Sequence, residues 1–227
     1  DLWSGPAPLR PYHPASHPLV WRCWWDFGCG MMGDRGAHTL DAAVWALGLD
    51  APETVEATSL GLNPETHPLS AVVTYRFPAR GGRPPVRLTW YEGTRAPRPE
   101  ALEDGRKMPE EGGLVFKGSK GLVMCGVYGD SPRLVPESLM RDAVRPERSI
   151  PRIEGSHEQD WARACKKGEK AGAAFEYSGP LTEICLLGNV AKKLDTHIAW
   201  DAANLRVTNV PEAEMLIRRP TRPGWSL

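Results

Sequence analysis

An aspartate and a histidine four residues apart, Asp34 and His38, are the most chemically suggestive pair in this sequence. Residues at positions i and i+4 of a helix lie on the same face. A carboxylate beside an imidazole raises its basicity and holds its orientation. Such an imidazole can take the hydroxyl proton of an alcohol while hydride leaves the carbon that carries the hydroxyl. The spacing therefore predicts an acid–base pair on a helix.

Two other interpretations of this pair stay open on spacing alone. Asp34 could stabilise the helix dipole as an acidic residue near a helix N-terminus, with His38 in a purely structural role. The two side chains could also supply two ligands to a metal ion. Because no third ligand is indicated nearby, we expect no metal site.

The helix that carries the pair is predicted from about Gly33 to Leu47, with Gly48 and Pro52 ending it. On a helical projection Asp41 and Trp45 share the narrow polar stripe of Asp34 and His38. The neighbouring flank is apolar and is expected to pack on a sheet. Its residues are Ala37, Leu40, Val44 and Leu47. Glycines at positions 28, 30, 33 and 36 would let a backbone or a ligand approach the helix start closely.

The segment before this helix holds further candidate substrate contacts, Arg22, Trp24, Trp25 and Asp26. Aromatic planes beside charged hydrogen-bonding groups suit a carbohydrate, which offers apolar C–H faces and hydroxyls. Asp41 on the polar stripe joins this predicted substrate-binding set. The alternative is that the tryptophans anchor an irregular segment in the core.

Other polar residues have less chemical significance. His13 and His17 lie in a proline-rich stretch, where a surface or interdomain role is expected. Helix capping and dipole effects account for His157 and Asp160.

The rest of the chain predicts an α+β fold with an open, mostly antiparallel sheet and flanking helices, because period-two strands dominate the middle and no βαβ alternation occurs. Ser156 and Thr182 lie near two helix starts and could cap them. Strands are predicted at 54–60, 71–77, 86–91, 113–117, 121–126 and 133–135, with a last strand or extended segment in 198–208. Helices are predicted at about 156–167 and 180–194, with a short one after Pro211.

Composition excludes several functional classes. The chain has 227 residues, a formal net charge of zero, 41% hydrophobic and 25% charged residues. A neutral balance favours neither nucleic acid nor an anionic membrane surface as a partner, and no apolar run is long enough to span a bilayer. The five cysteines form no CxxC pair, so no zinc or redox motif is supported.

The opening of the chain is rich in proline and aromatic residues. Prolines block a helix there, while the aromatic load is too high for a disordered linker. We therefore expect residues 1–30 to form an irregular interdomain or pocket segment, and 31–227 to form an α+β substrate-binding and oligomerisation domain. Because Asp1 is not a methionine, we expect a chain truncated from a longer protein. The compartment, cytoplasmic or periplasmic, stays undetermined, since any export signal would lie upstream.

The stretch GMMGDRGAHTLDAAVWAL at 30–47 resembles the substrate-domain helix of the Gfo/Idh/MocA oxidoreductases. The shared pattern is a glycine-rich entry, then Asp, three residues, His, two residues and Asp. Five further segments, in the same order, resemble a bacterial branch of that family. They are DLWSGPAPLRPYHP at 1–14, WRCWWDFGCG at 21–30, GSHEQDWARACKKG at 155–168, YSGPLTEICLLGNVA at 177–191 and WDAANLRVTN at 200–209.

The resemblance implies a two-domain enzyme. An N-terminal Rossmann domain would bind NAD or NADP, and a C-terminal domain, like that of glyceraldehyde-3-phosphate dehydrogenase, would supply an open sheet and the substrate-facing helix. The family's Asp and His correspond to Asp34 and His38. Its lysine has no counterpart in these 227 residues. The stretch GCGMMG at 28–33 has the GxGxxG spacing, but no strand is predicted before it and no βαβ unit around it, so it does not form the dinucleotide fingerprint. The isolated chain is therefore expected to be inactive and to bind the cofactor poorly.

Three functions remain after this step. The leading one is a NAD(P)-dependent dehydrogenase acting on a secondary hydroxyl of a sugar or polyol, in a homo-oligomer formed through the open sheet face. The second is a redox-neutral relative that cleaves or isomerises glycosides with tightly bound NAD. The third is a non-catalytic sugar-binding or oligomerisation domain.

Overall fold

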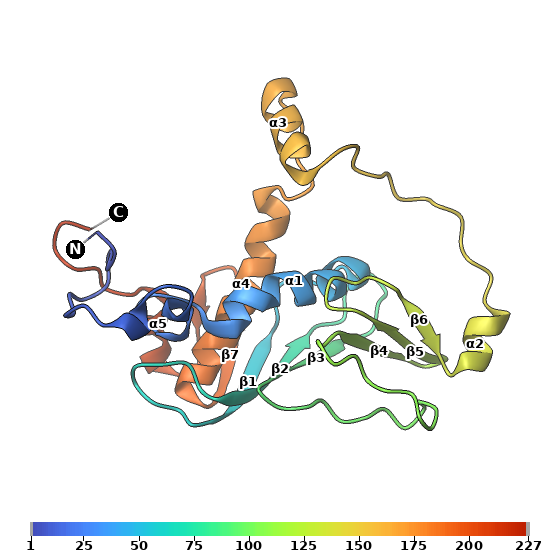
Figure 1. Ribbon diagram of the computed structural model, residues 1–227, viewed down its shortest axis with the longest axis horizontal. Helices are drawn as coiled ribbons and strands as arrows, with labels where there is room; N and C mark the ends of the chain where they lie inside the picture. Colours follow the sequence, from blue (N-terminus) through green and yellow to red (C-terminus); the bar gives the residue numbers. More distant parts are fainter. Residues whose placement is uncertain (1, 226–227) are drawn as a thin grey trace. The chain divides into compact units, whose positions relative to one another are not determined.

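A computed structural model describes residues 2–225 (Figure 1). The chain divides into two compact units. The first unit comprises residues 1–97 and 182–227, and the second comprises residues 98–181. These units do not test the predicted boundary at residue 30, which stays a prediction.

A five-stranded antiparallel sheet is the base of the first unit, with strand order β3-β2-β1-β7-β8. Strand β2 alternates strictly, with Ala71, Val73, Tyr75 and Phe77 buried on one face. The period of two in the sequence correctly predicted that face. The strands are β1 (Thr54–Leu60), β2 (Ser70–Phe77), β3 (Val86–Glu92), β7 (His197–Asp201) and β8 (Arg206–Val207).

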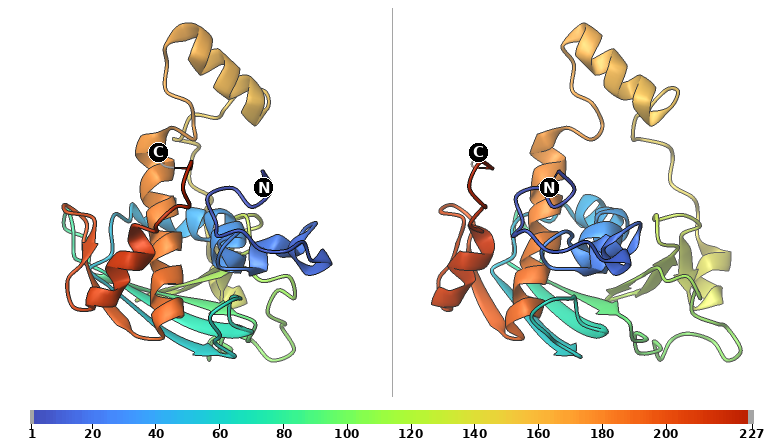
Figure 2. Two further views of the ribbon diagram at one scale, coloured as in Figure 1. Left: turned by 90° about the vertical axis from the view of Figure 1, so that its left-hand side faces the viewer. Right: turned by 60° about the vertical axis from the view of Figure 1, so that its left-hand side comes forward.

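Two helices, α1 (Gly30–Leu47) and α4 (Phe175–Leu194), lie on the same side of this sheet (Figures 1 and 2). The core between them and the sheet includes Met32 and Val44 from α1 and Ile184 from α4. The first turns of α4, up to Leu181, are assigned to the second unit. The predicted α+β class with a mostly antiparallel, open sheet is confirmed.

Helix α1 begins at Gly30, one turn earlier than predicted. Gly30 has a positive φ of 59°, a conformation open to glycine at no steric cost. The buried face, which includes Gly36, Leu40 and Ala43, lies opposite the polar stripe and not beside it. Ala37, expected on the apolar flank, is exposed. The stripe therefore faces away from the core of its unit.

Residues 2–29 form an irregular segment with two short 3-10 helices, η1 (Pro14–Ser16) and η2 (Val20–Cys23). We call this the N-terminal segment. It lies beside the C-terminal part of the chain (Figures 1 and 2). Arg222 donates its backbone N–H to Pro6 and its Nε–H to the carbonyl oxygen of Gly5. This C-terminal part includes η3 (Pro211–Ala213) and α5 (Glu214–Ile217).

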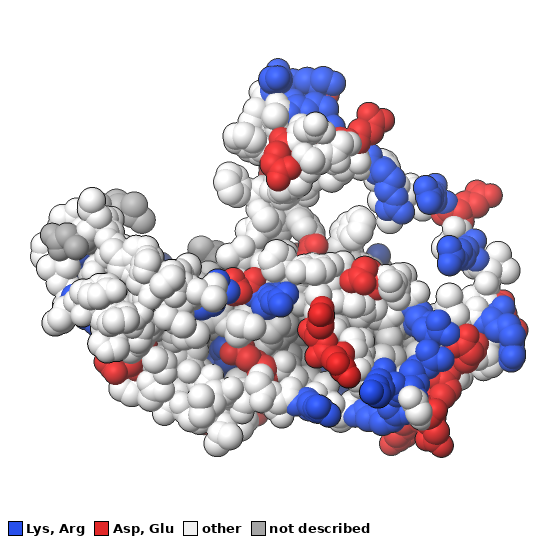
Figure 3. Space-filling view, viewed as in Figure 1, with Lys and Arg blue, Asp and Glu red and all other residues white. Residues whose placement is uncertain are grey.

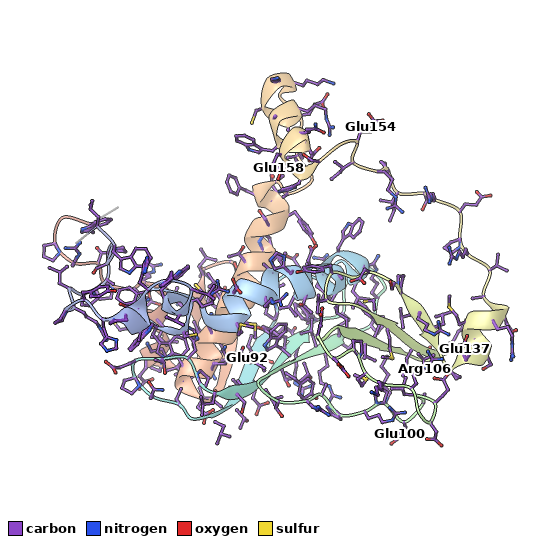
Figure 4. The ribbon with its side chains drawn as sticks, viewed as in Figure 1. Glu92, Glu100, Arg106, Glu137, Glu154 and Glu158 are labelled. Atoms are coloured by element: carbon purple, nitrogen blue, oxygen red, sulfur yellow. The ribbon has the colours of Figure 1, made fainter. Side chains whose placement is uncertain are left out.

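The second unit contains a three-stranded antiparallel sheet of order β4-β5-β6. A small core of Leu102, Leu122, Met124 and Val135 holds it. Arg106 and Glu137, labelled in Figure 4, form an ion pair at 2.7 Å. The elements are β4 (Leu114–Gly118), β5 (Gly121–Cys125), β6 (Arg133–Val135), α2 (Glu137–Asp142) and α3 (His157–Lys167).

Several predicted helix boundaries need correction. Ser156 does cap α3, in a full capping box with Gln159. Thr182 lies inside α4 and not at its start, because α4 begins at Phe175 and runs through Pro180. Pro180, which stands at the predicted start of this helix, is its sixth residue. Helix α2 was not predicted, since six residues carry too little periodicity to detect.

A buried ion pair joins α4 to β3. Lys192 Nζ lies 2.9 Å from Glu92 Oε2 and 3.1 Å from Oε1, and the two side chains are 0% and 8% exposed. Trp90 Nε1 donates to the same carboxylate at 3.1 Å. Glu92, labelled in Figure 4, thus has three hydrogen bonds in a dry environment. Burial lowers the pKa of Lys192, and the Glu92 carboxylate opposes that shift.

Removing one partner of this pair should destabilise the first unit strongly. We expect Lys192→Met to cost about 3–5 kcal/mol, because the Glu92 carboxylate is left buried without its cation. Urea unfolding followed by circular dichroism measures the change.

The matched control is Lys170→Met, since Lys170 pairs with Glu176 at 3.5 Å but is 77% exposed. An exposed pair should change stability by less than about 0.5 kcal/mol. The double variant Lys192→Met/Glu92→Leu should recover much of the loss. Equal losses for Lys170→Met and Lys192→Met would refute this account of the buried pair.

Candidate functional site

Asp34 and His38 lie one turn apart on α1, and both are exposed. Trp45 on the same stripe is 59% exposed, and Asp41 is half-buried. Helix α1 therefore presents a carboxylate, an imidazole and an indole along one line. This matches the predicted stripe, while the catalytic role of the pair stays a prediction.

Arg22 reaches Asp34 from the N-terminal segment. Its Nη1 donates to Asp34 Oδ2 at 2.7 Å, and its Nε donates to the carbonyl oxygen of Leu19 at 3.1 Å. A Cβ at Gly28 would lie only 2.5 Å from the Arg22 Cα, so the chain can fold back there only with glycine at position 28. The predicted substrate contact Arg22 is thus brought directly to the predicted catalytic pair.

Trp25, another predicted substrate contact, is only 6% exposed. Its indole packs against the His67 ring in a tilted arrangement, with ring centroids 3.6 Å apart. Lys193 Nζ lies over the indole, 4.7 Å from its centroid. Its Nε1–H points to the carbonyl oxygen of Asn63 at 3.4 Å. Trp25 anchors the segment in the core in this structure, which was the alternative left open by the sequence.

His67 was not identified from the sequence, where it stands in an unremarkable loop. Its Nε2 lies 3.2 Å from the carbonyl oxygen of Gly28, and since a carbonyl only accepts, Nε2 carries the proton. Its Nδ1 is buried and has no hydrogen-bond partner among the described residues. Burial is the main cause that lowers the pKa of His67 to about 4. His67 is therefore neutral at pH 7.

Asn189 of α4 fixes the next peptide of the same turn. Its Nδ2 donates to the carbonyl oxygen of Cys29 at 2.7 Å. His67 and Asn189 together hold the two carbonyls that precede α1. They set the position from which Asp34 and His38 project.

Asp26 lies in an ion network and not on the α1 stripe. Its two oxygens pair with Arg219 at 3.1 Å and with Arg10 at 2.7 Å. Arg10 also contacts Glu65 at 3.0 Å, and Arg219 donates to the carbonyl oxygen of Trp25 at 2.8 Å. These contacts give Asp26 a structural role in the N-terminal segment.

Trp24 is half-buried, and its Nε1 donates to the carbonyl oxygen of Ala15 at 2.8 Å. It lines a pocket of the N-terminal segment together with His13 and His17. Of the predicted substrate contacts, Arg22 lies against Asp34 of the predicted catalytic pair, and Trp24 lines this separate pocket.

The described residues show neither a cluster of potential metal ligands nor a parallel-strand site for a dinucleotide. Residues 2–225 contain no cluster of three or more potential metal ligands. Their sheets are antiparallel, so they lack the parallel strand crevice and helix start that hold a pyrophosphate. Within the same residues no helix is long and apolar enough to cross a membrane.

Comparison with known families places the chain. The model for the oxidoreductase family, C-terminal alpha/beta domain, of the Gfo/Idh/MocA group matches residues 1–227. The chain therefore belongs to the Gfo/Idh/MocA oxidoreductase family and represents its C-terminal domain. No curated protein matches it.

Three solved structures are similar to this chain, and the first of them supports the fold. A NAD-binding protein from Listeria innocua has 15% identity and a TM-score of 0.50, over 80% of this chain and 51% of that chain. A putative oxidoreductase, yvaA, from Bacillus subtilis has 16% identity and a TM-score of 0.37, over 75% and 52%. A probable dehydrogenase from Thermotoga maritima has 18% identity and a TM-score of 0.32, over 74% and 47%. The chain spans about half the length of these proteins.

His67 should make stability depend on pH in a defined window. Its pKa is about 4 in the folded protein against an ordinary 6.5, so the unfolded chain binds more protons between these values. The contribution is complete above about pH 6.5 and is lost as pH falls towards 4, by up to about 3 kcal/mol. Urea unfolding at a series of pH values measures this slope.

His67→Gln should flatten the slope, because glutamine does not titrate. His157→Gln is the matched control, since His157 is exposed at the start of α3. An unchanged slope in His67→Gln would show that another group controls the acid sensitivity.

Proposed function

We propose that this chain is the substrate-binding half of a NAD(P)-dependent oxidoreductase that acts on a secondary hydroxyl of a sugar or polyol. The observation that carries the proposal is the outward projection of Asp34 and His38 from a helix whose other face is fixed in the core. Membership of an oxidoreductase family supports the reaction class. The substrate class is inferred from the acid–base pair and from Arg22, which lies against it.

The proton step belongs to this chain. An imidazole nitrogen of His38 takes the hydroxyl proton of the substrate as the carbinol C–H bond breaks, and returns a proton in the reducing direction. A bound nicotinamide would supply the hydride acceptor. Asp34 on the preceding turn orients the imidazole.

Arg22 adds a third polar group to this arrangement. Through its 2.7 Å bond to Asp34 it fixes the carboxylate rotamer. The ion pair is charge-compensated, so it favours a neutral hydroxyl over an anionic group at the adjacent position. This is consistent with a sugar or polyol and gives no reason to expect a phosphorylated substrate.

Substitution of the pair should lower turnover while leaving the fold intact. In the whole enzyme with its cofactor, His38→Gln should reduce kcat at least about 100-fold, the usual contribution of a general base. Asp34→Asn should have a smaller effect, because it removes only the orienting charge. The measurement is nicotinamide reduction with a panel of sugars and polyols.

His157→Gln serves as the matched control, since His157 is an exposed histidine of the second unit. Activity of His38→Gln within about twofold of the unsubstituted enzyme would contradict the proposed role of His38.

Self-association is a second part of the proposal. Within the first unit, α1 and α4 lie on one side of the five-stranded sheet (Figure 2). The opposite side carries mainly threonine and charged residues by strand register. They include Glu56, Thr58, Thr74, Arg76, Arg87 and Thr89. We propose that this side pairs two copies of the chain, and light scattering of the purified protein tests it: a monomer at micromolar concentration contradicts it.

A further inference from the structure

A pocket of about 870 Å³ opens in the N-terminal segment. Its volume lies in the range of small-molecule sites. All of its described lining residues belong to the first unit. The lining includes four aromatic side chains: Trp3, Tyr12, Trp24 and Phe27.

These aromatic side chains are held in place. Trp24 is fixed by its bond to the carbonyl oxygen of Ala15, and the ring of Trp3 meets His17 edge-on with centroids 4.5 Å apart. Tyr12 and Trp3 are nevertheless 79% and 55% exposed, so much of their surface is open to a ligand. Exposed aromatic rings with fixed neighbours offer apolar contact area at low entropic cost.

The polar lining is balanced in charge. Arg10 is the only lysine or arginine among the described lining residues, and its two terminal guanidinium nitrogens donate to Asp26 and Glu65. His13 Nδ1 accepts a bond from the backbone N–H of Ala15, so in the neutral ring the proton is on Nε2. Ser16 and Glu65 add oxygen atoms. In Figure 3 the surface of this segment, on the left, is largely uncharged.

We propose that this pocket is a second carbohydrate-binding site, which takes a neutral pyranose ring. Aromatic faces match the C–H faces of a pyranose, and the imidazole, hydroxyl and carboxylate groups match its hydroxyls. The proposal shares the ligand class of the proposed function and rests on it in that respect. Its residues are separate, since neither Asp34, His38 nor Arg22 belongs to the described lining.

A dinucleotide is the competing occupant, because nicotinamide and adenine rings also stack on indoles. Its two phosphates need cations or helix N-termini. Arg10 already forms ion pairs with Asp26 and Glu65, and Glu65 itself lines the pocket. A ligand with two negative charges would therefore lose the hydration of its charges and be repelled by Glu65 without a cation in compensation. A neutral sugar avoids the repulsion, and its hydroxyls cost less to desolvate.

The site extends the proposed function towards larger substrates. An enzyme with a reaction site on α1 and a separate pyranose site on the N-terminal segment can bind a glycoside or oligosaccharide through two rings. Linking two weak contacts in one ligand raises its apparent affinity without new contacts at either site.

The test measures binding of methyl β-D-glucopyranoside and methyl β-D-galactopyranoside to the protein by saturation-transfer NMR titration. We expect at least one of them to bind, and Trp3→Ala and Tyr12→Ala each to weaken that binding roughly three- to tenfold through the lost aromatic contact. Trp161→Ala is the matched control, because Trp161 is a comparably exposed tryptophan (64%) of the second unit. Circular dichroism checks that every variant is folded.

Three results would overturn the inference. One is no saturation transfer to either pyranoside. Another is binding that is lost in His38→Ala but unchanged in Trp3→Ala, which would move the sugar to α1 and leave the proposed function standing. The third is displacement of the pyranoside by NAD⁺ in a Trp3-dependent manner, which would make the pocket a nucleotide site. Conversely, Trp3-dependent binding by a whole enzyme that oxidises no sugar or polyol in the presence of its cofactor supports this site and refutes the proposed function.

Discussion

The close approach of α1 to the groups around its start is the constraint on which the candidate site depends. A Cβ at Gly30 would lie 2.5 Å from His67 Nδ1, and one at Gly36 would lie 3.0 Å from Cys185 Sγ. Only glycine lets the helix come so near to the imidazole ring and to α4. Because Gly36 lies on the buried side of α1 against Cys185, the opposite side, which carries Asp34 and His38, points outwards. Packing thus determines the direction of the candidate catalytic groups.

The N-terminal segment depends on a different interaction, the pairing of arginines with backbone carbonyls and carboxylates. The side chain of Arg219 donates to the carbonyl oxygen of Trp25 and to the carboxylate of Asp26. Arg222 donates its side-chain Nε–H to Gly5 and its backbone N–H to Pro6. A proline-rich segment has few backbone N–H groups with which to form a ladder. Guanidinium groups supply several donors in a fixed geometry and replace that ladder. The C-terminal arginines therefore order the segment that carries Arg22 and the aromatic pocket.

The sequence allowed prediction of the elements whose burial follows a period. Strand β2 and the stripe of α1 were found because alternation and helical spacing reflect one packed face. Trp25 shows the limit of such reasoning, since an aromatic residue near a candidate site fits both a ligand and the core. His67, Asn189 and Arg219 could not be found, because their partners are 39, 160 and up to 194 residues away in the chain. Contacts of this kind arise from the fold and leave no local pattern.

The ion pair between Arg22 and Asp34 is exposed enough to open when a ligand binds to this face of α1. The two side chains are 29% and 38% exposed, and ion pairs at this exposure contribute less than about 1 kcal/mol. Opening the pair therefore costs little compared with the free energy of binding a polar ligand. In the resting state Arg22 satisfies the carboxylate and fixes its rotamer. Under the proposed function, a substrate hydroxyl would then bond to the guanidinium of Arg22 in place of the Asp34 carboxylate. A buried pair, like that of Lys192 and Glu92, could not exchange partners in this way, because each separated charge would stay out of reach of water.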